Sequence, residues 1–150
     1  MQHDSYSDDY LREILKGTRT IAVVGASPRP YRPSHRVMHY LQRQGYRAIP
    51  VNPFAAGDTI LGERCHVALA EISERVDLVD IFRRSEFAGA AVDQAIVIGA
   101  KAVWMQLGVI DKAAAERAEA HGIKVVMDRC PAIEIPRLGL ERDRGMDGPG

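Results

Sequence analysis

Three arginines closely follow a turn of small residues in the first third of the chain. The turn is Gly25-Ala26-Ser27, and Arg29, Arg32 and Arg36 come after it. Guanidinium groups bind phosphate through paired hydrogen bonds and stay charged at all working pH values. A helix beginning near Ser34 would add unpaired N–H groups and the positive end of its dipole. This combination predicts a site for a ligand that carries several phosphates.

The elements that must position this turn are a buried strand before it and a helix after it. Residues 20–24 are predicted as the strand, because their apolar side chains do not alternate with polar ones. Further strands are predicted at 46–51, 77–82, 102–105 and 123–127, and helices at 7–16, 34–44, 86–99 and 111–121. Asp111 is the expected N-cap of the last of these helices, and residues 54–63 are expected to form a loop.

The alternation of strands and helices predicts an α/β fold with a parallel sheet. We expect one Rossmann-like, doubly wound domain, with five parallel strands in the order 3-2-1-4-5 and helices on both faces. Residues 20–138 would form this domain, 1–19 a helix packed on it, and 139–150 a flexible tail.

Ligands of such folds lie beyond the carboxyl ends of the strands, so residues just after each strand are candidates for the site. Besides the first turn, these segments are Asn52-Pro53, Arg83-Arg84, Gln106-Leu107-Gly108 and Asp128-Arg129-Cys130.

Composition narrows the classes of partner. Twenty basic and twenty acidic residues cancel in a chain of 150 residues, so no net charge favours nucleic acid or a membrane surface. No apolar stretch approaches the length of about 20 residues that spans a bilayer. The first residues do not resemble a signal peptide, so we expect a cytoplasmic protein. Cys65 and Cys130 lack metal-ligand spacing, and no metal is expected.

The first turn differs from the dinucleotide-binding fingerprint. The pattern GxGxxG would need glycine at the positions of Ser27 and Pro30. NAD-binding folds usually place an acidic residue at the end of the second strand, where this chain has Asn52. An NAD(H)-binding redox sensor is therefore a disfavoured alternative.

The chain resembles the small stand-alone CoA-binding proteins of bacteria and archaea. Their fold also occurs as the N-terminal domain of the succinyl-CoA synthetase α subunit. The matching segments are VVGASPRPYRPSHRVMHYL, GYRAIPVNP, VDLVDIFR, AVWMQLGV and GIKVVMDRC. They extend from Thr20 to about Leu138.

This resemblance implies a CoA or acyl-CoA ligand at the carboxyl edge of the sheet. The first-turn motif falls on Gly25, Ala26 and Ser27, with Arg32 and Ser34 at the start of the following helix. The resemblance further implies that the adenosine part is framed by Val51, Asn52, Pro53, Phe82 and Arg83, and that the pantetheine arm runs toward Gln106, Leu107 and Gly108. Arg29 completes the set of candidate binding residues.

Other reactive side chains give weaker hypotheses. Cys130 could face the ligand, but a buried small residue is the more common role of a free cysteine. His35 is expected at a solvated helix start, and Trp104 in the core. Asp80, inside a predicted strand, would need polar partners. No catalytic residue is predicted, because no nucleophile, base and orienting group share a motif.

The leading hypothesis is a CoA-binding protein without catalytic activity of its own, acting as a carrier, sensor or regulatory partner in acyl-CoA metabolism. The resemblance leaves a second hypothesis open, in which the chain is one component of a multi-chain acyl-CoA synthetase. The phosphohistidine domain and the nucleotide-grasp subunit of such enzymes have no counterpart in this sequence. A protein partner or a homo-oligomer is compatible with both hypotheses.

Overall fold

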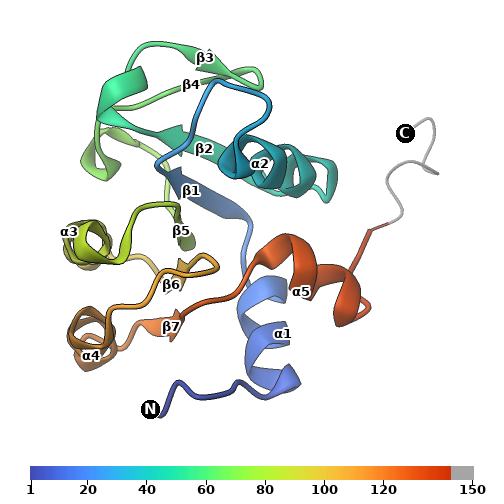
Figure 1. The fold of residues 1–150 in the computed structure, drawn as a ribbon, viewed down its shortest axis with the longest axis vertical. Helices are drawn as coiled ribbons and strands as arrows, with labels where there is room; N and C mark the ends of the chain where they lie inside the picture. The colour runs from blue at the N-terminus through green and yellow to red at the C-terminus, as the bar shows by residue number, and fades with distance from the viewer. Residues whose placement is uncertain (143–150) are drawn as a thin grey trace.

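Five parallel strands form the centre of the structure, a computed structural model in which residues 1–142 are described. The strands are β1 (Thr20–Val24), β2 (Arg47–Val51), β5 (Leu78–Ile81), β6 (Ala102–Met105) and β7 (Lys124–Val126). They lie in the order β2-β1-β5-β6-β7 (Figure 1). The predicted Rossmann-like α/β class with a five-stranded parallel sheet is confirmed.

The position of β5 within this sheet differs from the expected strand order. Counted along the chain, the strands lie in the order 2-1-3-4-5, because β5 pairs with β1 rather than outside β2. Pro50 explains why β2 is the edge strand. Its carbonyl oxygen accepts from His66 N on the outer side at 3.0 Å, so its missing N–H also faces away from β1. Both orders leave the carboxyl end of β1 at the switch point, so the expected place of the site is unchanged.

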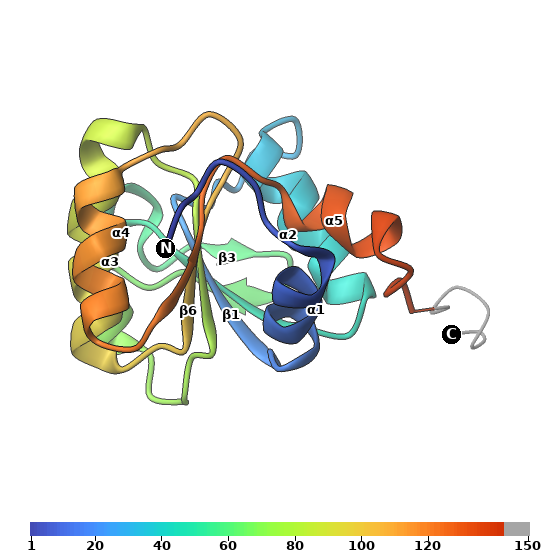
Figure 2. The same cartoon turned by 90° about the horizontal axis from the view of Figure 1, so that it is seen from below.

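Helices cover both faces of the sheet, and each face has its own apolar layer. Helices α1 (Asp8–Lys16), α2 (Pro33–Arg43) and α5 (Pro131–Arg137) pack on one face. Helices α3 (Ser85–Ile98) and α4 (Lys112–Ala120) pack on the other (Figure 2). None of these described helices is long and apolar enough to cross a bilayer.

The ends of two helices follow the capping signals in the sequence. Ser7 Oγ accepts from Tyr10 N at 3.1 Å at the start of α1. Asp111 Oδ1 accepts from Ala114 N at 3.0 Å, which confirms Asp111 as the N-cap of α4. Each bond satisfies an N–H group that has no partner inside its helix.

Two parts of the chain contain more structure than expected. The segment expected to be a loop holds a hairpin of β3 (Thr59–Ile60) and β4 (Glu63–Arg64), with the short helix η1 (Pro53–Ala55) before it. The short helix η2 (Leu69–Glu71) lies between this hairpin and β5, within residues 65–72, where the sequence predicts a short helical turn. Helix α5 was not expected, because Pro136 lies inside it. A proline is tolerated there because the helix ends at the next residue, so a single intrahelical bond is lost.

The predicted tail begins among residues that contact the domain. Leu140 packs against the apolar layer, and Tyr40 Oη donates to Glu141 Oε2 at 2.8 Å. The rest of that tail, residues 143–150, lies outside the described residues.

Candidate functional site

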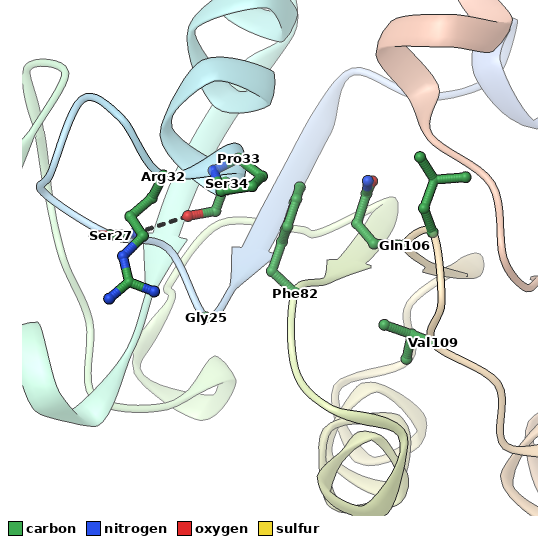
Figure 3. A pocket seen from close by; sticks show the side chains of 9 residues that line it. Gly25, Ser27, Arg32, Pro33, Ser34, Phe82, Gln106 and Val109 are labelled. Carbon is green, nitrogen blue, oxygen red and sulfur yellow. Dashed lines mark hydrogen bonds between the residues drawn. The ribbon is translucent and has the colours of Figure 1, made fainter.

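A cleft of about 410 Å³ opens over the carboxyl ends of β1, β5 and β6. The residues that line it come from the turn after β1, the start of α2, the end of β5 and the loop after β6. They are Gly25, Ser27, Arg32, Pro33, Ser34, Phe82, Gln106, Leu107 and Val109 (Figure 3). This is the edge of the sheet at which the sequence predicted a ligand site.

Gly25 allows the first turn to pass very close to the end of β5. Its φ is +88°, and a Cβ atom at this position would lie 2.3 Å from the carbonyl oxygen of Phe82. Phe82 N donates to Val24 O and so holds the end of β5 beside the turn, and Gly25 N donates to Val51 O at the end of β2, each at 2.8 Å. Only glycine fits both this conformation and this close approach.

Two serines tie the turn to the start of α2. Ser27 N donates to Ser34 Oγ at 3.1 Å, the dashed bond in Figure 3, and Ser34 is buried. Ser27 Oγ in turn accepts from Arg29 N at 3.1 Å. These bonds fix the path of the loop, so the backbone of the turn and the first residues of α2 face the same cleft.

The N-terminus of α2 is open toward the cleft. Arg32 occupies its N-cap position without a capping side-chain bond, and Pro33 begins the helix. Unpaired N–H groups and the helix dipole favour an anion at such an end. Among residues 1–142, the ion pairs involve neither Arg29, Arg32 nor Arg83. The described acidic side chains therefore leave these cations free to meet a phosphate.

Ala26 points away from the cleft, into the core. Its side chain is fully buried in the apolar layer beneath α2. Its carbonyl oxygen accepts from Asn52 Nδ2 at 2.8 Å. The turn therefore presents backbone and Ser27 to the cleft, and a larger side chain at position 26 would disturb packing before it met a ligand.

The predicted residues after β2 support the turn from behind. Val51 is buried, and Pro53 is exposed at the start of η1. Besides its bond to Ala26, Asn52 accepts from Phe54 N at 3.0 Å through Oδ1. An Asn side chain can donate and accept at once, which an Asp could not do here. Asn52 therefore has a structural task at the position where NAD-binding folds place an acid.

The loop after β6 is held by side chains that the sequence analysis did not connect with it. Gly108 N donates to Asp128 Oδ1 at 2.7 Å. Ser85 Oγ donates to Gly108 O at 3.3 Å and accepts from Ile110 N at 2.9 Å. Asp128 itself has a φ of +58°, which is strained for a residue other than glycine. These contacts keep Leu107 and Val109 at the wall of the cleft.

The predicted site residues fall into two groups. The first lines the cleft and comprises Gly25, Ser27, Arg32, Ser34, Phe82, Gln106 and Leu107. The second lies around or behind it and comprises Ala26, Arg29, Val51, Asn52, Pro53, Arg83 and Gly108. Pro33 and Val109 line the cleft without having been predicted, although each directly follows a predicted residue or segment.

The side chains that gave the weaker hypotheses are not among those that line the cleft. Cys130 is buried at the N-cap position of α5, and burial raises the pKa of the Cys65 thiol. Trp104 is fully buried, as expected, and its Nε1 donates to Arg129 O at 2.9 Å. His35, in the first turn of α2, does not line the cleft. The described residues hold no group of three or more His, Cys, Asp or Glu side chains arranged to bind a metal ion.

A parallel sheet with a glycine turn and a helix N-terminus at its switch point defines a Rossmann-like ligand-binding domain. Residues 19–136 match the family model described as the CoA binding domain, and the chain belongs to this family.

Similar proteins include both stand-alone chains and larger enzymes. The chain is 38% identical over 130 residues to the uncharacterized protein YneT of Bacillus subtilis, covering 87% of this chain and 93% of that one. It is 29% identical over 128 residues to acetate–CoA ligase [ADP-forming] I of Archaeoglobus fulgidus, but this match spans 79% of the chain and 18% of the ligase.

Solved structures give the same picture. A hypothetical protein from Pyrococcus horikoshii superimposes with a TM-score of 0.86 at 37% identity, over 92% of this chain and 96% of that one. A dinucleotide-forming acetyl-coenzyme A synthetase 1 from Ca. Korarchaeum cryptofilum has a TM-score of 0.68 at 23% identity, over 76% of this chain and 26% of that one. The second likeness shows a shared fold.

Proposed function

We propose that this protein binds CoA or acyl-CoA in the cleft over β1, β5 and β6, and that it has no catalytic activity by itself. It would act as a carrier, sensor or regulatory partner in acyl-CoA metabolism. This proposal rests on one observation: the turn at Gly25, which passes close to the end of β5, lies beside the open start of α2, where Arg32 adds a positive charge. Membership of the CoA-binding family supports CoA over other phosphorylated ligands.

In the proposed complex, the pyrophosphate lies against the first turn and the start of α2. Backbone N–H groups, the helix dipole and the Arg32 guanidinium would then act on the same negative charge. The adenosine part extends toward the residues that follow β2 and β5, and the pantetheine arm toward Gln106, Leu107 and Gly108. The apolar side chains of Phe82, Leu107 and Val109 would pack against the uncharged parts of the arm.

The chemistry of the cleft wall supports binding without catalysis. Arg32 is the one ionisable side chain among the nine lining residues, and a permanently charged guanidinium is a poor general acid or base. A serine without an adjacent base is a weak nucleophile. These side chains suit the recognition of an anion better than the transfer of a proton or an acyl group.

A second candidate function is that of a component in a multi-chain acyl-CoA synthetase. The similarity to part of an acetate–CoA ligase favours it, because that ligase contains a segment similar to this chain within a much longer protein. An NAD(H)-binding sensor is less favoured, since Ser27 and Asn52 replace residues of the usual NAD-binding pattern and Asn52 is engaged with the turn.

Native mass spectrometry of the protein freshly purified from its host tests the proposal. We expect an adduct with the mass of CoA or an acyl-CoA. A second protein chain that co-purifies in a complex with the CoA-bound protein would support the alternative of a synthetase component. An adduct with the mass of NAD would contradict the CoA assignment.

A further inference from the structure

Three buried oxygen atoms in the described part of the chain have no hydrogen-bond partner. They are Oδ1 and Oδ2 of Asp80 and Oε1 of Gln106. Both residues are buried, and Asp80 has no exposed surface. Buried polar atoms are nearly always paired, because leaving one without a partner costs the free energy of its lost hydration. Such a group therefore requires a specific explanation.

The two side chains are neighbours on the sheet. Asp80 of β5 pairs with Trp104 of β6, and Gln106 N donates to Ile81 O at 3.2 Å just beyond that pair. Side chains alternate along a strand, so Asp80 and Gln106 lie on the same face, diagonally across adjacent strands. A glutamine side chain is long enough to bridge such a diagonal.

Gln106 also forms part of the cleft, whereas Asp80 lies one step deeper. Gln106 lines the cleft together with Phe82, the next residue after Asp80 on the same face of β5. Figure 3 shows that Gln106 and Phe82 extend from the sheet in the same direction. Asp80 is therefore placed to contact a residue that touches ligand without being reached from solvent itself.

Burial favours the uncharged form of Asp80. Desolvation raises the pKa of its carboxyl well above the ordinary value, and no other cause contributes to the shift. The helices over this face are α1, α2 and α5, whose buried ionisable side chains are Cys130 and Glu134. Glu134 Oε1 is already occupied by Arg137 Nε at 2.8 Å. An uncharged carboxylic acid carries one O–H donor, which an ionised one lacks.

We propose that Asp80, as an uncharged acid, donates a hydrogen bond to Gln106 Oε1 and so fixes the Gln106 amide with Nε2 directed into the cleft. There Nε2 donates to a carbonyl oxygen of the ligand's pantetheine arm. This inference rests on the proposed binding of CoA. Asp80 is a positioning residue, because it acts on the ligand through Gln106. An ionised Asp80 would need a donor instead, which would turn Gln106 Oε1 toward the ligand.

Titration with two ligands isolates the effect of the arm. CoA carries pantetheine, whereas adenosine 3′,5′-bisphosphate carries phosphates but no arm. In Asp80→Leu we expect CoA affinity to fall by roughly three- to tenfold, the effect of one hydrogen bond, with unchanged affinity for the bisphosphate. Asp80→Asn should keep CoA affinity within about twofold, because its amide N–H can replace the acid as donor to Gln106 Oε1.

Three further variants keep the test decisive. Gln106→Met should reproduce the selective loss of CoA affinity, and the double variant Asp80→Leu/Gln106→Met should lose no more than either single one, because all three break the same contact. Asp77→Asn, at the other end of β5, should change neither affinity. If Asp80→Leu does not fold, rescue by Asp80→Asn and the loss in Gln106→Met still decide the matter.

Two outcomes would overturn the inference. They are wild-type CoA affinity in Asp80→Leu or Gln106→Met, and an equal loss of CoA and bisphosphate affinity. Failure of the wild-type protein to bind CoA would refute the proposed function instead, so the two failures are distinguishable.

Discussion

At the scale of single residues, Arg32 and Gly25 make opposite contributions to the cleft. Arg32 is exposed and supplies charge at the start of α2. Gly25 has no side chain, so the backbone there can approach both β5 and a ligand. The two residues therefore require different measurements, one of binding and one of stability.

Replacing Arg32 by Ala should weaken CoA binding and leave the fold intact. A charge-assisted hydrogen bond contributes about 1.5–3 kcal/mol, which corresponds to about tenfold or more in affinity. The salt dependence of binding should also become weaker, because a charged contact is screened by added ions. Calorimetric titration at two salt concentrations measures both effects.

The matched control for this variant is Arg43→Ala in the last turn of the same helix. It removes the same charge at the end remote from the cleft and should change the dissociation constant little. Equal dissociation constants for Arg32→Ala and the wild-type protein would show that Arg32 is a solvated surface residue.

Gly25→Ala should destabilise the protein more than Gly57→Ala. Both glycines have a φ near +90°, but a Cβ at Gly57 would have no heavy atom within 4 Å, whereas a Cβ at Gly25 would lie 2.3 Å from Phe82 O. The positive φ alone costs about 1–2 kcal/mol for a residue with a side chain. Urea denaturation of both variants separates this strain from the close contact. Similar free energies of unfolding would mean that the turn can move away from β5.

At the scale of elements, the cleft depends on loops that are fixed by side chains from other loops. The loop after β6 carries Leu107 and Val109, and it is held by Ser85 at the start of α3 and by Asp128 after β7. Asp128 adopts a strained backbone conformation while it accepts from Gly108 N. Such strain is found where the surrounding structure imposes a geometry that function uses.

Three substitutions at Asp128 separate its hydrogen bond from its strain. Asp128→Asn should keep CoA affinity, because Asn accepts the same bond and tolerates a positive φ. Asp128→Gly relieves the strain and Asp128→Ala keeps it, but both lose the acceptor and should weaken CoA binding by roughly two- to tenfold. Amide hydrogen exchange at Gly108 and Ile110 should become faster in the Gly and Ala variants. Unchanged exchange and affinity in both would show that this loop is held without Asp128.

Local signals in the sequence predicted most of these elements. The apolar strands, the N-cap at Asp111 and the position of the first turn depend on neighbouring residues, and the structure confirms them. The strand order does not depend on neighbouring residues, and it was predicted wrongly. The overlooked signal is Pro50, because its missing N–H cannot serve a central strand. Helix α5 was missed because Pro136 argues against a helix unless its end is already known.

The place of the candidate site could be predicted from the sequence, but the directions and partners of its side chains could not. Residues after β1, β5 and β6 follow from the rule that ligands lie beyond the carboxyl ends of strands. The inward direction of Ala26 and the isolation of Asp80 depend on how distant segments pack. Sequence could indicate that Asp80 needs partners, but it could not reveal that the described structure supplies none.

At the scale of the whole molecule, two aspartates affect stability in opposite directions when they ionise: Asp77 directly before β5 and Asp80 within it. Burial raises the pKa of Asp77. The hydrogen bonds that Asp77 accepts from Arg19 N and Thr20 N, together with the nearby Lys101, lower this pKa by more than burial raises it, so the net shift is downward. The pKa of Asp80 is raised by burial. A lowered folded-state pKa stabilises the protein above the unfolded-state pKa, and a raised one loses stabilisation as the pH increases.

The pH dependence of unfolding should therefore differ between two matched variants. Asp80→Asn should gain stability relative to wild type by about 1.4 kcal/mol per pH unit, starting near pH 4 and ending at the folded-state pKa of Asp80. Asp77→Asn should be less stable than wild type at pH 7, and this difference should disappear as the pH falls through the lowered pKa of Asp77. Urea denaturation from about pH 2 to about pH 8 measures both, and parallel curves for wild type and Asp80→Asn would mean that Asp80 is ionised in the folded protein.

We expect the cleft to be selective for CoA among adenine nucleotides. Calorimetric titration of the wild-type protein with CoA, NAD and ATP, in the same buffer at moderate salt, tests it most directly. The arginines near the first turn, the open start of α2 and the family of the chain predict that CoA binds more tightly than either NAD or ATP. An affinity for NAD that equals or exceeds that for CoA would contradict this account.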